Sequence, residues 1–359
     1  MIVKIWSPVT IPLEEINMSI SFKNDYGQLA HPRILEALTR YGQQTNIPYG
    51  LDSHSENASR LILDIFGARQ GKTFFLAGGT QTNMVFISSV LRPFQGVLSC
   101  ASGHINVHET AAVEGTGHKI YVVPGNGGKL YPQDIENAVK ANLDEHMVQI
   151  KMVYISNSTE IGTIYSKQEL LDLRKACDKY GLYLFIDGAR LGSALTSRAN
   201  DMEPSLLGKV ADAFYVGGTK NGLLYGEALV IVNPDLQTDF RYHIKHKGAM
   251  LAKGYGLGIQ FEEAFKDGLY FEIAKKTNDM ASLLREGCLE LGLDVGTSPT
   301  NQIFITFPKE AAIALINEYG CEKWEEKEDK MTIRFVTSFM TTEEEVKEAL
   351  VYIKNLIGA

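Results

Sequence analysis

The stretch of residues 151–187 constrains the fold more than any other part of the sequence. Residues 152–155 form a short apolar run of strand-forming side chains, and residues 182–186 form a second run with no polar alternation. Between the two runs, residues 166–169 read Ser-Lys-Gln-Glu, which has the spacing of a helix capping box, and Gly181 stands where a helix would end. Strands that are apolar on both faces belong to parallel sheets covered by helices. The stretch therefore predicts a βαβ unit.

The same alternation recurs on both sides of this unit. It predicts further strands at residues 73–76, 96–100, 120–123, 213–216 and 227–232, and a helix over residues 81–91. After residue 258 the pattern changes to helices at 261–291 and 342–357 around strands at 302–307 and 331–336. We expect an α/β chain with a large domain (residues 21–255) built on a mostly parallel sheet. A smaller C-terminal α+β domain (residues 256–359) should follow, and residues 1–20 should pack with it.

Composition limits the kind of partner and compartment. The chain has 359 residues, of which 45% are hydrophobic, and a net charge of −8, so a surface that binds nucleic acid is not expected. The four cysteines are far apart, and none forms the C-x-x-C pair of a metal or redox site. No apolar stretch approaches the ~20 residues needed to cross a membrane. These features predict a cytoplasmic protein with no metal, nucleic-acid or membrane partner.

Three features with possible chemical roles each follow a predicted strand, where ligands bind in open α/β sheets. The Gly-rich turn at residues 77–83 can form an anion site at a helix N-terminus, although it matches neither common nucleotide-binding motif. Asp187 ends a buried strand and needs a partner there; the alternative is a structural pair with Arg190 or a helix cap. Lys220 follows two glycines, and a buried amine there would bond readily to an aldehyde; the alternative is an exposed turn lysine.

Together the three features are the parts that a pyridoxal-phosphate site requires. The turn would anchor the phosphate, and Lys220 would carry the cofactor through its aldehyde. Asp187 would keep the ring nitrogen protonated, so that the ring can accept the electrons of a bond broken at the substrate Cα.

At these positions the chain resembles a known family, the threonine aldolases of PLP fold type I (the aspartate aminotransferase-like fold), which belong with the β-eliminating lyases. The subgroup it resembles most includes phenylserine aldolases. The resemblance covers almost the whole chain from about Ser19. It is carried, in family order, by motifs at residues 21–26, 49–53, 78–83, 103–104, 187–190, 218–220 and 333–334.

The resemblance implies roles for individual residues. Gly79, Thr80 and Thr219 would lie near the phosphate, and His104 would stack on the cofactor ring. Ser21 and Arg190 would contact the carboxylate end of the site. Arg334 would bind the substrate carboxylate through a two-pronged contact, with a rim ion pair as the alternative. Tyr49 and a basic residue from 241–247, or Lys253, would enter the site of a neighbouring subunit in a homodimer or homotetramer.

One departure concerns the base that removes the proton of the substrate hydroxyl. Glu160 stands where many family members have a histidine, His104 is preferred because its motif matches the family, and His108 is less favoured. The alternative is that Glu160 caps a turn near Gly162 and a bound water takes the proton. The resemblance implies cleavage of threonine, allo-threonine or phenylserine to glycine and an aldehyde. The alternatives are β-elimination to a 2-oxo acid and ammonia and, more remotely, a non-catalytic binding protein on the same fold.

Overall fold

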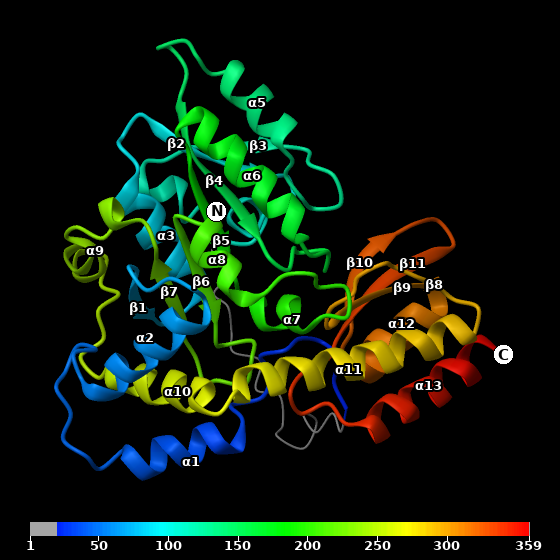
Figure 1. Cartoon of the computed structure of the whole chain (residues 1–359). Helices are drawn as coiled ribbons and strands as arrows, with labels where there is room; N and C mark the ends of the chain where they lie inside the picture. The colour runs from blue at the N-terminus through cyan, green and yellow to red at the C-terminus, as the bar shows by residue number, and fades with distance from the viewer. Residues whose placement is uncertain (1–19, 359) are drawn as a thin grey trace, which may run out of the picture.

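The computed structural model describes residues 20–358, and its main feature is a seven-stranded sheet in the order β1-β7-β6-β5-β4-β2-β3 (Figure 1). β7 runs antiparallel to β1 and β6, and the other pairs are parallel, so the predicted mostly parallel sheet is confirmed. The strands are β1 (Lys72–Leu76), β2 (Gln95–Cys100), β3 (Ile120–Val123), β4 (Gln149–Ser156), β5 (Tyr183–Asp187), β6 (Ala213–Gly217) and β7 (Glu227–Ile231).

Apolar side chains on both faces of the sheet explain why helices cover both sides. In β5, Phe185 packs against Phe86 of α3 with ring centroids 4.6 Å apart, whereas Ile186 joins a core on the opposite face that includes Leu173 of α6. The helices are α1 (Pro32–Tyr41), α2 (Ser53–Ile65), α3 (Gly79–Val90), α4 (His104–Val107), α5 (Pro132–Lys140), α6 (Lys167–Tyr180), α7 (Leu191–Thr196), α8 (Leu207–Val210), α9 (Phe240–His246) and α10 (Tyr255–Lys266).

The predicted βαβ unit is confirmed as β4, α6 and β5. The Ser166 side chain accepts a hydrogen bond from the Glu169 backbone N–H, and the Glu169 carboxylate accepts one from the Ser166 backbone N–H. Gly181 ends the helix with φ of 63°, a left-handed conformation that glycine adopts without a steric penalty.

A second core lies around an antiparallel sheet in the order β10-β11-β9-β8, and the long helix α11 (Leu269–Glu290) runs from the first sheet to this one (Figure 1). Ile20 and Phe22 join the second core. The expected single helix over residues 261–291 is wrong, because Gly268, with φ of 78°, separates α10 from α11. The remaining elements are β8 (Asp294–Val295), β9 (Gln302–Pro308), β10 (Glu322–Glu326), β11 (Lys330–Val336), α12 (Lys309–Tyr319) and α13 (Glu343–Ile357).

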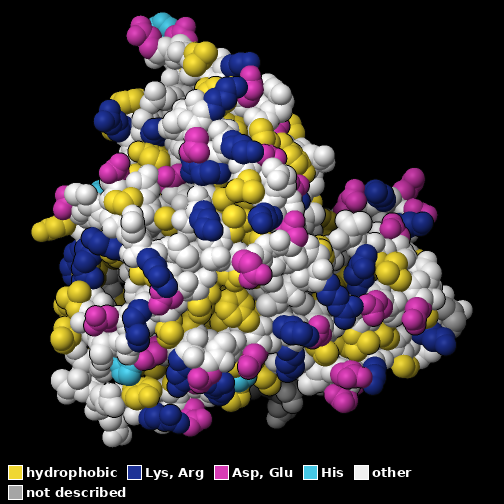
Figure 2. All heavy atoms as spheres, viewed as in Figure 1, with side chains coloured by type: hydrophobic (Ala, Val, Ile, Leu, Met, Phe, Trp, Pro, Cys, Tyr) yellow, Lys and Arg dark blue, Asp and Glu magenta, His cyan; other side chains and the backbone are white. Residues whose placement is uncertain are grey.

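The division at residue 255 stays a prediction. Residues 1–20, which we expect to pack with the smaller domain, lie outside the described residues except for Ile20. Within residues 20–358, no helix combines the length and apolar character needed to cross a membrane. Acidic and basic side chains are interspersed over the face shown in Figure 2.

The strand directions bring separate loops to one edge of the large sheet. The carboxyl ends of β1, β2, β4, β5 and β6 lie at this edge, and the antiparallel strand β7 begins there. Asp187 is the last residue of β5, and the segments that follow the other ends contain the Gly-rich turn, His104, Glu160 and Lys220. This edge of the sheet therefore carries the candidate site.

Candidate functional site

The Asp187 carboxylate accepts four hydrogen bonds at the end of β5. Its Oδ1 accepts from the Tyr215 hydroxyl (2.5 Å) and the Ala189 backbone N–H (3.0 Å), and its Oδ2 accepts from the Tyr154 hydroxyl (2.5 Å) and Asn83 Nδ2 (3.1 Å). Burial and the neighbouring Asp187 charge raise the pKa of both tyrosines well above the usual value, so both remain donors. Asp187 is thus held as an acceptor in a buried position.

A chain of hydrogen bonds joins Asp187 to His104. Asn83 Nδ2 also donates to Glu109 Oε1 (2.7 Å), and this oxygen lies 2.8 Å from His104 Nδ1. The Glu109 side chain is completely buried. Burial lowers the pKa of His104, but the hydrogen bond with Glu109 and the charges of Asp187 and Glu160 outweigh it, so the pKa of His104 is raised overall. The chain therefore favours the charged form of the His104 imidazole.

Lys220 lies in the same group of side chains and is partly buried. Its Nζ is 5.9 Å from the centre of the Tyr26 ring. Burial and the positive charge of Arg190 lower the pKa of Lys220, although nearby carboxylates oppose this shift. A lowered pKa leaves more of the amine in its neutral, nucleophilic form.

The Gly-rich turn presents free backbone donors at the start of α3. The first intrahelical bond of this helix runs from the Thr82 N–H to the Gly78 carbonyl. The N–H groups of Gly79 and Thr80 precede it and therefore have no partner in their own helix. The helix dipole adds a partial positive charge at the same point, so the turn is suited to an anion.

Arg190 does not pair with Asp187, so that alternative is wrong. Its Nε and Nη2 donate to the two carboxylate oxygens of Asp25 at 2.7 and 3.0 Å, and both side chains are almost completely buried. Asn301 also donates to Asp25, at 2.9 Å, and links this pair to the second core. Asp25 thus holds the Arg190 guanidinium near Lys220 through Nε and Nη2, and the Nη1 of Arg190 takes no part in this pair.

Arg334 and Ser21 are adjacent in sequence to residues of the second core, Phe335 and Phe22. Arg334 donates to Gln302 (3.1 Å) and forms an ion pair with Glu322, as the alternative prediction had it. Ser21 is next to Phe22, whose carbonyl accepts from the Val336 backbone N–H (2.8 Å), two residues beyond Arg334. Ser21 and Arg334 are thus on adjacent backbone segments.

Glu160 is partly buried in the loop after β4. Its charge raises the pKa of His104 and opposes the lowered pKa of Lys220. These effects require Glu160 to lie near both residues, because electrostatic interactions weaken with distance. His108 is also close, with its ring 5.5 Å from that of His104.

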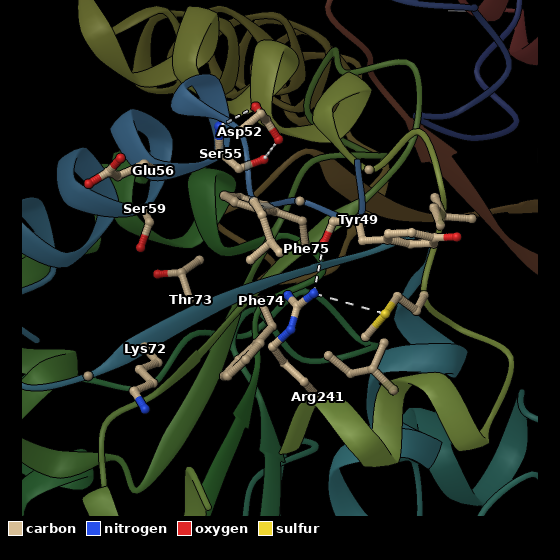
Figure 3. Close-up of a pocket in the computed structure, with 17 residues that line it drawn as sticks. Tyr49, Asp52, Ser55, Glu56, Ser59, Lys72, Thr73, Phe74, Phe75 and Arg241 are labelled. Carbon is tan, nitrogen blue, oxygen red and sulfur yellow. Dashed lines mark hydrogen bonds between the residues drawn. The ribbon is translucent and has the colours of Figure 1, made fainter. Parts of the chain in front are cut away.

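Tyr49 lies elsewhere, at the rim of a cavity of about 390 Å³ between α2, β1 and α9 (Figure 3). Its backbone carbonyl accepts from Arg241 Nη2 (3.1 Å), and Lys245 Nζ is 5.3 Å from the centre of its ring. The residues that line this cavity do not include Lys220. The structure therefore does not bring Tyr49 to the Lys220 site of its own chain.

Several partners of the site were not predicted. Glu109 and Asn83 bridge His104 to Asp187, and Tyr154 and Tyr215 cover Asp187. The two tyrosines were read only as parts of apolar strands, although their hydroxyl groups need partners when buried. The position of Glu109, five residues after His104, was the one available signal for its role.

Comparisons with known proteins identify the family and the fold. The family model described as beta-eliminating lyase matches residues 35–311. The chain is 30% identical over 242 residues to the low specificity L-threonine aldolase of Pseudomonas aeruginosa, covering 66% of this chain and 69% of the relative. It is 26% identical to the enzyme of the same name from a Pseudomonas species, covering 96% and 99% of the two chains.

Solved structures agree. A Leishmania major threonine aldolase has a TM-score of 0.92 at 42% identity, covering 94% of this chain and 99% of that one. A Thermus thermophilus aspartate aminotransferase, with a TM-score of 0.68 at 14% identity, shares the fold. With a family model matched over most of its length, and the buried acid and the lysine at one edge of the sheet, this chain belongs to the beta-eliminating lyase family.

Proposed function

We propose that this protein is a pyridoxal-phosphate-dependent aldolase that cleaves threonine, allo-threonine or a related β-hydroxy-α-amino acid to glycine and an aldehyde. The observation that carries the proposal is the convergence of Lys220, Asp187 and the free N–H groups of α3 at one edge of the sheet. The similarity to threonine aldolases from Pseudomonas and Leishmania supports the reaction type.

The residues fit the cofactor. Lys220 would hold it, the α3 N-terminus would bind the phosphate, and Asp187 would face the ring nitrogen. A carboxylate has about four acceptor positions, and protein donors fill four on Asp187. A protonated ring nitrogen would therefore displace one of these donors or share its acceptor position. Asn83 makes the longest of the four bonds, at 3.1 Å, and is the donor we expect to be displaced. When bound, the cofactor supplies an electron sink for the bond broken at Cα.

The protein side chains would then bind the substrate and handle its protons. We assign the substrate carboxylate to Arg334 and to the free edge of Arg190, with Ser21 beside them. A substrate carboxylate at Arg334 competes with Glu322, which holds the same guanidinium in the structure. Because the Glu322 side chain is 51% exposed, it can move into solvent when the substrate arrives.

The base for the substrate hydroxyl is His104 or Glu160. The Glu109 bond that raises the pKa of His104 also reduces the fraction of neutral imidazole available to accept a proton, which favours Glu160 in this chain. Glu160→Gln and His104→Asn should be compared at several pH values with threonine, allo-threonine and phenylserine. Rates and isomer preferences that change by less than about threefold in both variants would rule out both residues as the base.

We further propose a cytoplasmic homodimer, or a homotetramer built from dimers, in which Tyr49 and a basic residue of 241–247, or Lys253, complete the partner's site. Exposed apolar side chains around the Tyr49 cavity support this, since Tyr49, Leu51 and Tyr242 are 40%, 59% and 76% exposed. Mixing Lys220→Ala and Tyr49→Ala subunits should restore activity in heterodimers, because one of the two sites is then intact. No recovery after verified subunit exchange would contradict shared sites.

The test of the function is direct. Purified protein should bind pyridoxal phosphate, and borohydride reduction followed by peptide mapping should place the cofactor on Lys220. Threonine should then yield acetaldehyde and glycine. Release of a 2-oxo acid and ammonia would instead indicate β-elimination, and a protein that neither binds the cofactor nor turns over amino acids would refute the proposal.

A further inference from the structure

A second buried acid, Glu227, lies at the same edge of the sheet as Asp187. It is the first residue of β7, it is 4% exposed, and its Cα partners are Gly217 of β6 and Leu76 of β1. Glu227 therefore sits between the strand that leads to Lys220 and the strand that leads to the Gly-rich turn. Among the described residues, no basic side chain forms an ion pair with it.

Two hydrogen bonds tie Glu227 to the Lys220 loop. Its Oε2 accepts from the Gly218 backbone N–H (3.0 Å), and its Oε1 accepts from the Thr219 hydroxyl (2.9 Å). The Thr219 oxygen in turn accepts from the Gly226 backbone N–H (2.9 Å). A hydroxyl group has only one hydrogen to donate. While Glu227 is ionised, Thr219 therefore has no hydrogen left for a ligand.

The surroundings disfavour the ionised form of Glu227. Burial raises the pKa of Glu227 to about 8, although its two hydrogen bonds and the charge of Lys220 lower it and the charge of Asp187 raises it further. The charge of Glu227 also acts on the hydroxyls of Tyr215 and Tyr270, and burial raises the pKa of each. A phosphate dianion nearby would add further repulsion between negative charges.

We propose that Glu227 is a positioning residue for the cofactor phosphate, acting in its protonated form through Thr219. The protonated carboxyl donates its hydrogen to Thr219 Oγ1, and the Thr219 hydroxyl hydrogen turns to the phosphate. An ionised Glu227 first takes up one proton from solvent, and no bond between heavy atoms forms or breaks. The inference rests on the proposed function in that the phosphate belongs to pyridoxal phosphate.

The register of the strands supports the placement of the phosphate. Leu76, opposite Glu227, is followed directly by the Gly-rich turn and the N-terminus of α3. A Cβ on Gly226 would lie 3.3 Å from the Leu76 carbonyl oxygen, so the two loops are in close contact. An anion on the N–H groups of α3 would thus be near Thr219. Proton binding at Glu227 and anion binding at α3 then favour each other, as thermodynamic linkage requires.

The test measures binding rather than turnover. Pyridoxine 5′-phosphate carries the ring and the phosphate but no aldehyde, so it cannot bond to Lys220. Its affinity for the full-length chain, freed of bound cofactor, is measured by calorimetry at pH 7 and pH 9.5, where the phosphate stays a dianion. The variant is Glu227→Gln, whose amide can donate to Thr219 at every pH. Both proteins are also measured in a Lys220→Met background, because Lys220, whose pKa is lowered by burial, would otherwise add its own pH dependence to binding.

We expect the two proteins to bind within about threefold of each other at pH 7. At pH 9.5 we expect Glu227→Gln to bind about tenfold more tightly than the wild type, because a single linked proton changes affinity by up to about tenfold per pH unit above its pKa. Unphosphorylated pyridoxine should show no such difference. Thr219→Val should bind the phosphate ester more weakly at pH 7, whereas Thr219→Ser should not.

Parallel pH profiles of the wild type and Glu227→Gln would overturn the inference and leave the proposed function intact. Failure of the wild type to bind either pyridoxine 5′-phosphate or pyridoxal phosphate would overturn both. If Glu227→Gln does not fold, proton uptake by Lys220→Met at pH 8.5, measured in buffers of different ionisation enthalpy, decides the question. Uptake with the phosphate ester but not with pyridoxine supports the role of Glu227, and zero uptake with both overturns it.

Discussion

The most informative single substitution for the hydrogen-bond chain is Glu109→Gln. Glu109 is completely buried, and its Oε1 contacts both His104 Nδ1 (2.8 Å) and Asn83 Nδ2 (2.7 Å). Glutamine has nearly the same shape, so the change removes a charge without leaving a cavity. We expect the pKa of His104 to fall, because burial is then opposed only by the charges of Asp187 and Glu160 and no longer by the bond with Glu109.

The magnitude follows from the kind of bond that is lost. A hydrogen bond to a charged group contributes about 1.5–3 kcal/mol, and a shift of one pKa unit corresponds to about 1.4 kcal/mol. Removing the charge of Glu109 should therefore lower the pKa of His104 and weaken the stabilisation of the charged imidazole by about 1.5–3 kcal/mol. In the wild type the folded-state pKa of His104 is raised above the unfolded value of 6.5. Its stabilising contribution is thus fully present below about pH 6.5 and is lost as the pH rises through the folded-state value.

The assay is an NMR titration of the histidine ring protons, with His104 assigned by comparison with His104→Asn. Urea unfolding at pH 6 and pH 9 should show that Glu109→Gln loses more stability at the lower pH. Glu114→Gln is the matched control, since Glu114 is an exposed carboxylate five residues further along the chain. A His104 pKa in Glu109→Gln within about 0.3 units of the wild type would refute the reasoning, because 0.3 units is well under 1 kcal/mol.

Three further predictions concern the scaffold and are measured by urea unfolding. Asp25→Asn should destabilise the protein by about 3–5 kcal/mol, because it leaves the buried charge of Arg190 without its partner. Gly188→Ala should cost about 3 kcal/mol or more, because its Cβ would lie 1.9 Å from the Tyr215 carbonyl oxygen. Ser166→Ala should cost about 1 kcal/mol through loss of the helix cap. An unchanged unfolding midpoint in any of these variants would contradict the corresponding contact.

The sequence was most informative about local structure and the ends of strands. The capping box at Ser166 and the apolar run before Asp187 depend on neighbouring residues, and both were predicted. Loops that follow parallel strands share one edge of a sheet, so Asp187, Lys220 and the Gly-rich turn could be expected together without knowledge of the strand order. Gly268 was the local signal that the long helical segment is in fact two helices.

Contacts between distant residues could not be predicted in the same way. Asp25 and Arg190 are 165 positions apart, and Asn83 and Asp187 are 104 positions apart. Their pairing depends on strand order and on loop paths, which local periodicity does not encode. Glu227 was read as part of the strand over residues 227–232. Only the antiparallel direction of β7 reveals that this first residue lies at the same edge as Lys220.

The two buried acids at this edge have different surroundings, and the difference suits different tasks. Asp187 accepts four hydrogen bonds, two of them from tyrosines that remain donors, and such an environment stabilises a negative charge. Glu227 accepts two hydrogen bonds from the Lys220 loop, one from the Gly218 backbone N–H and one from the Thr219 hydroxyl. Burial outweighs these bonds, so the pKa of Glu227 is raised to about 8. A carboxylate held in place as an acceptor suits a ring cation, whereas a phosphate dianion suits a neutral neighbour that can pass on a hydrogen bond. Environments that separate two nearby acids in this way are a common basis for assigning their roles. Asp187→Glu and Glu227→Asp would therefore not exchange the two proposed roles. The surrounding hydrogen-bond donors would have to be exchanged as well.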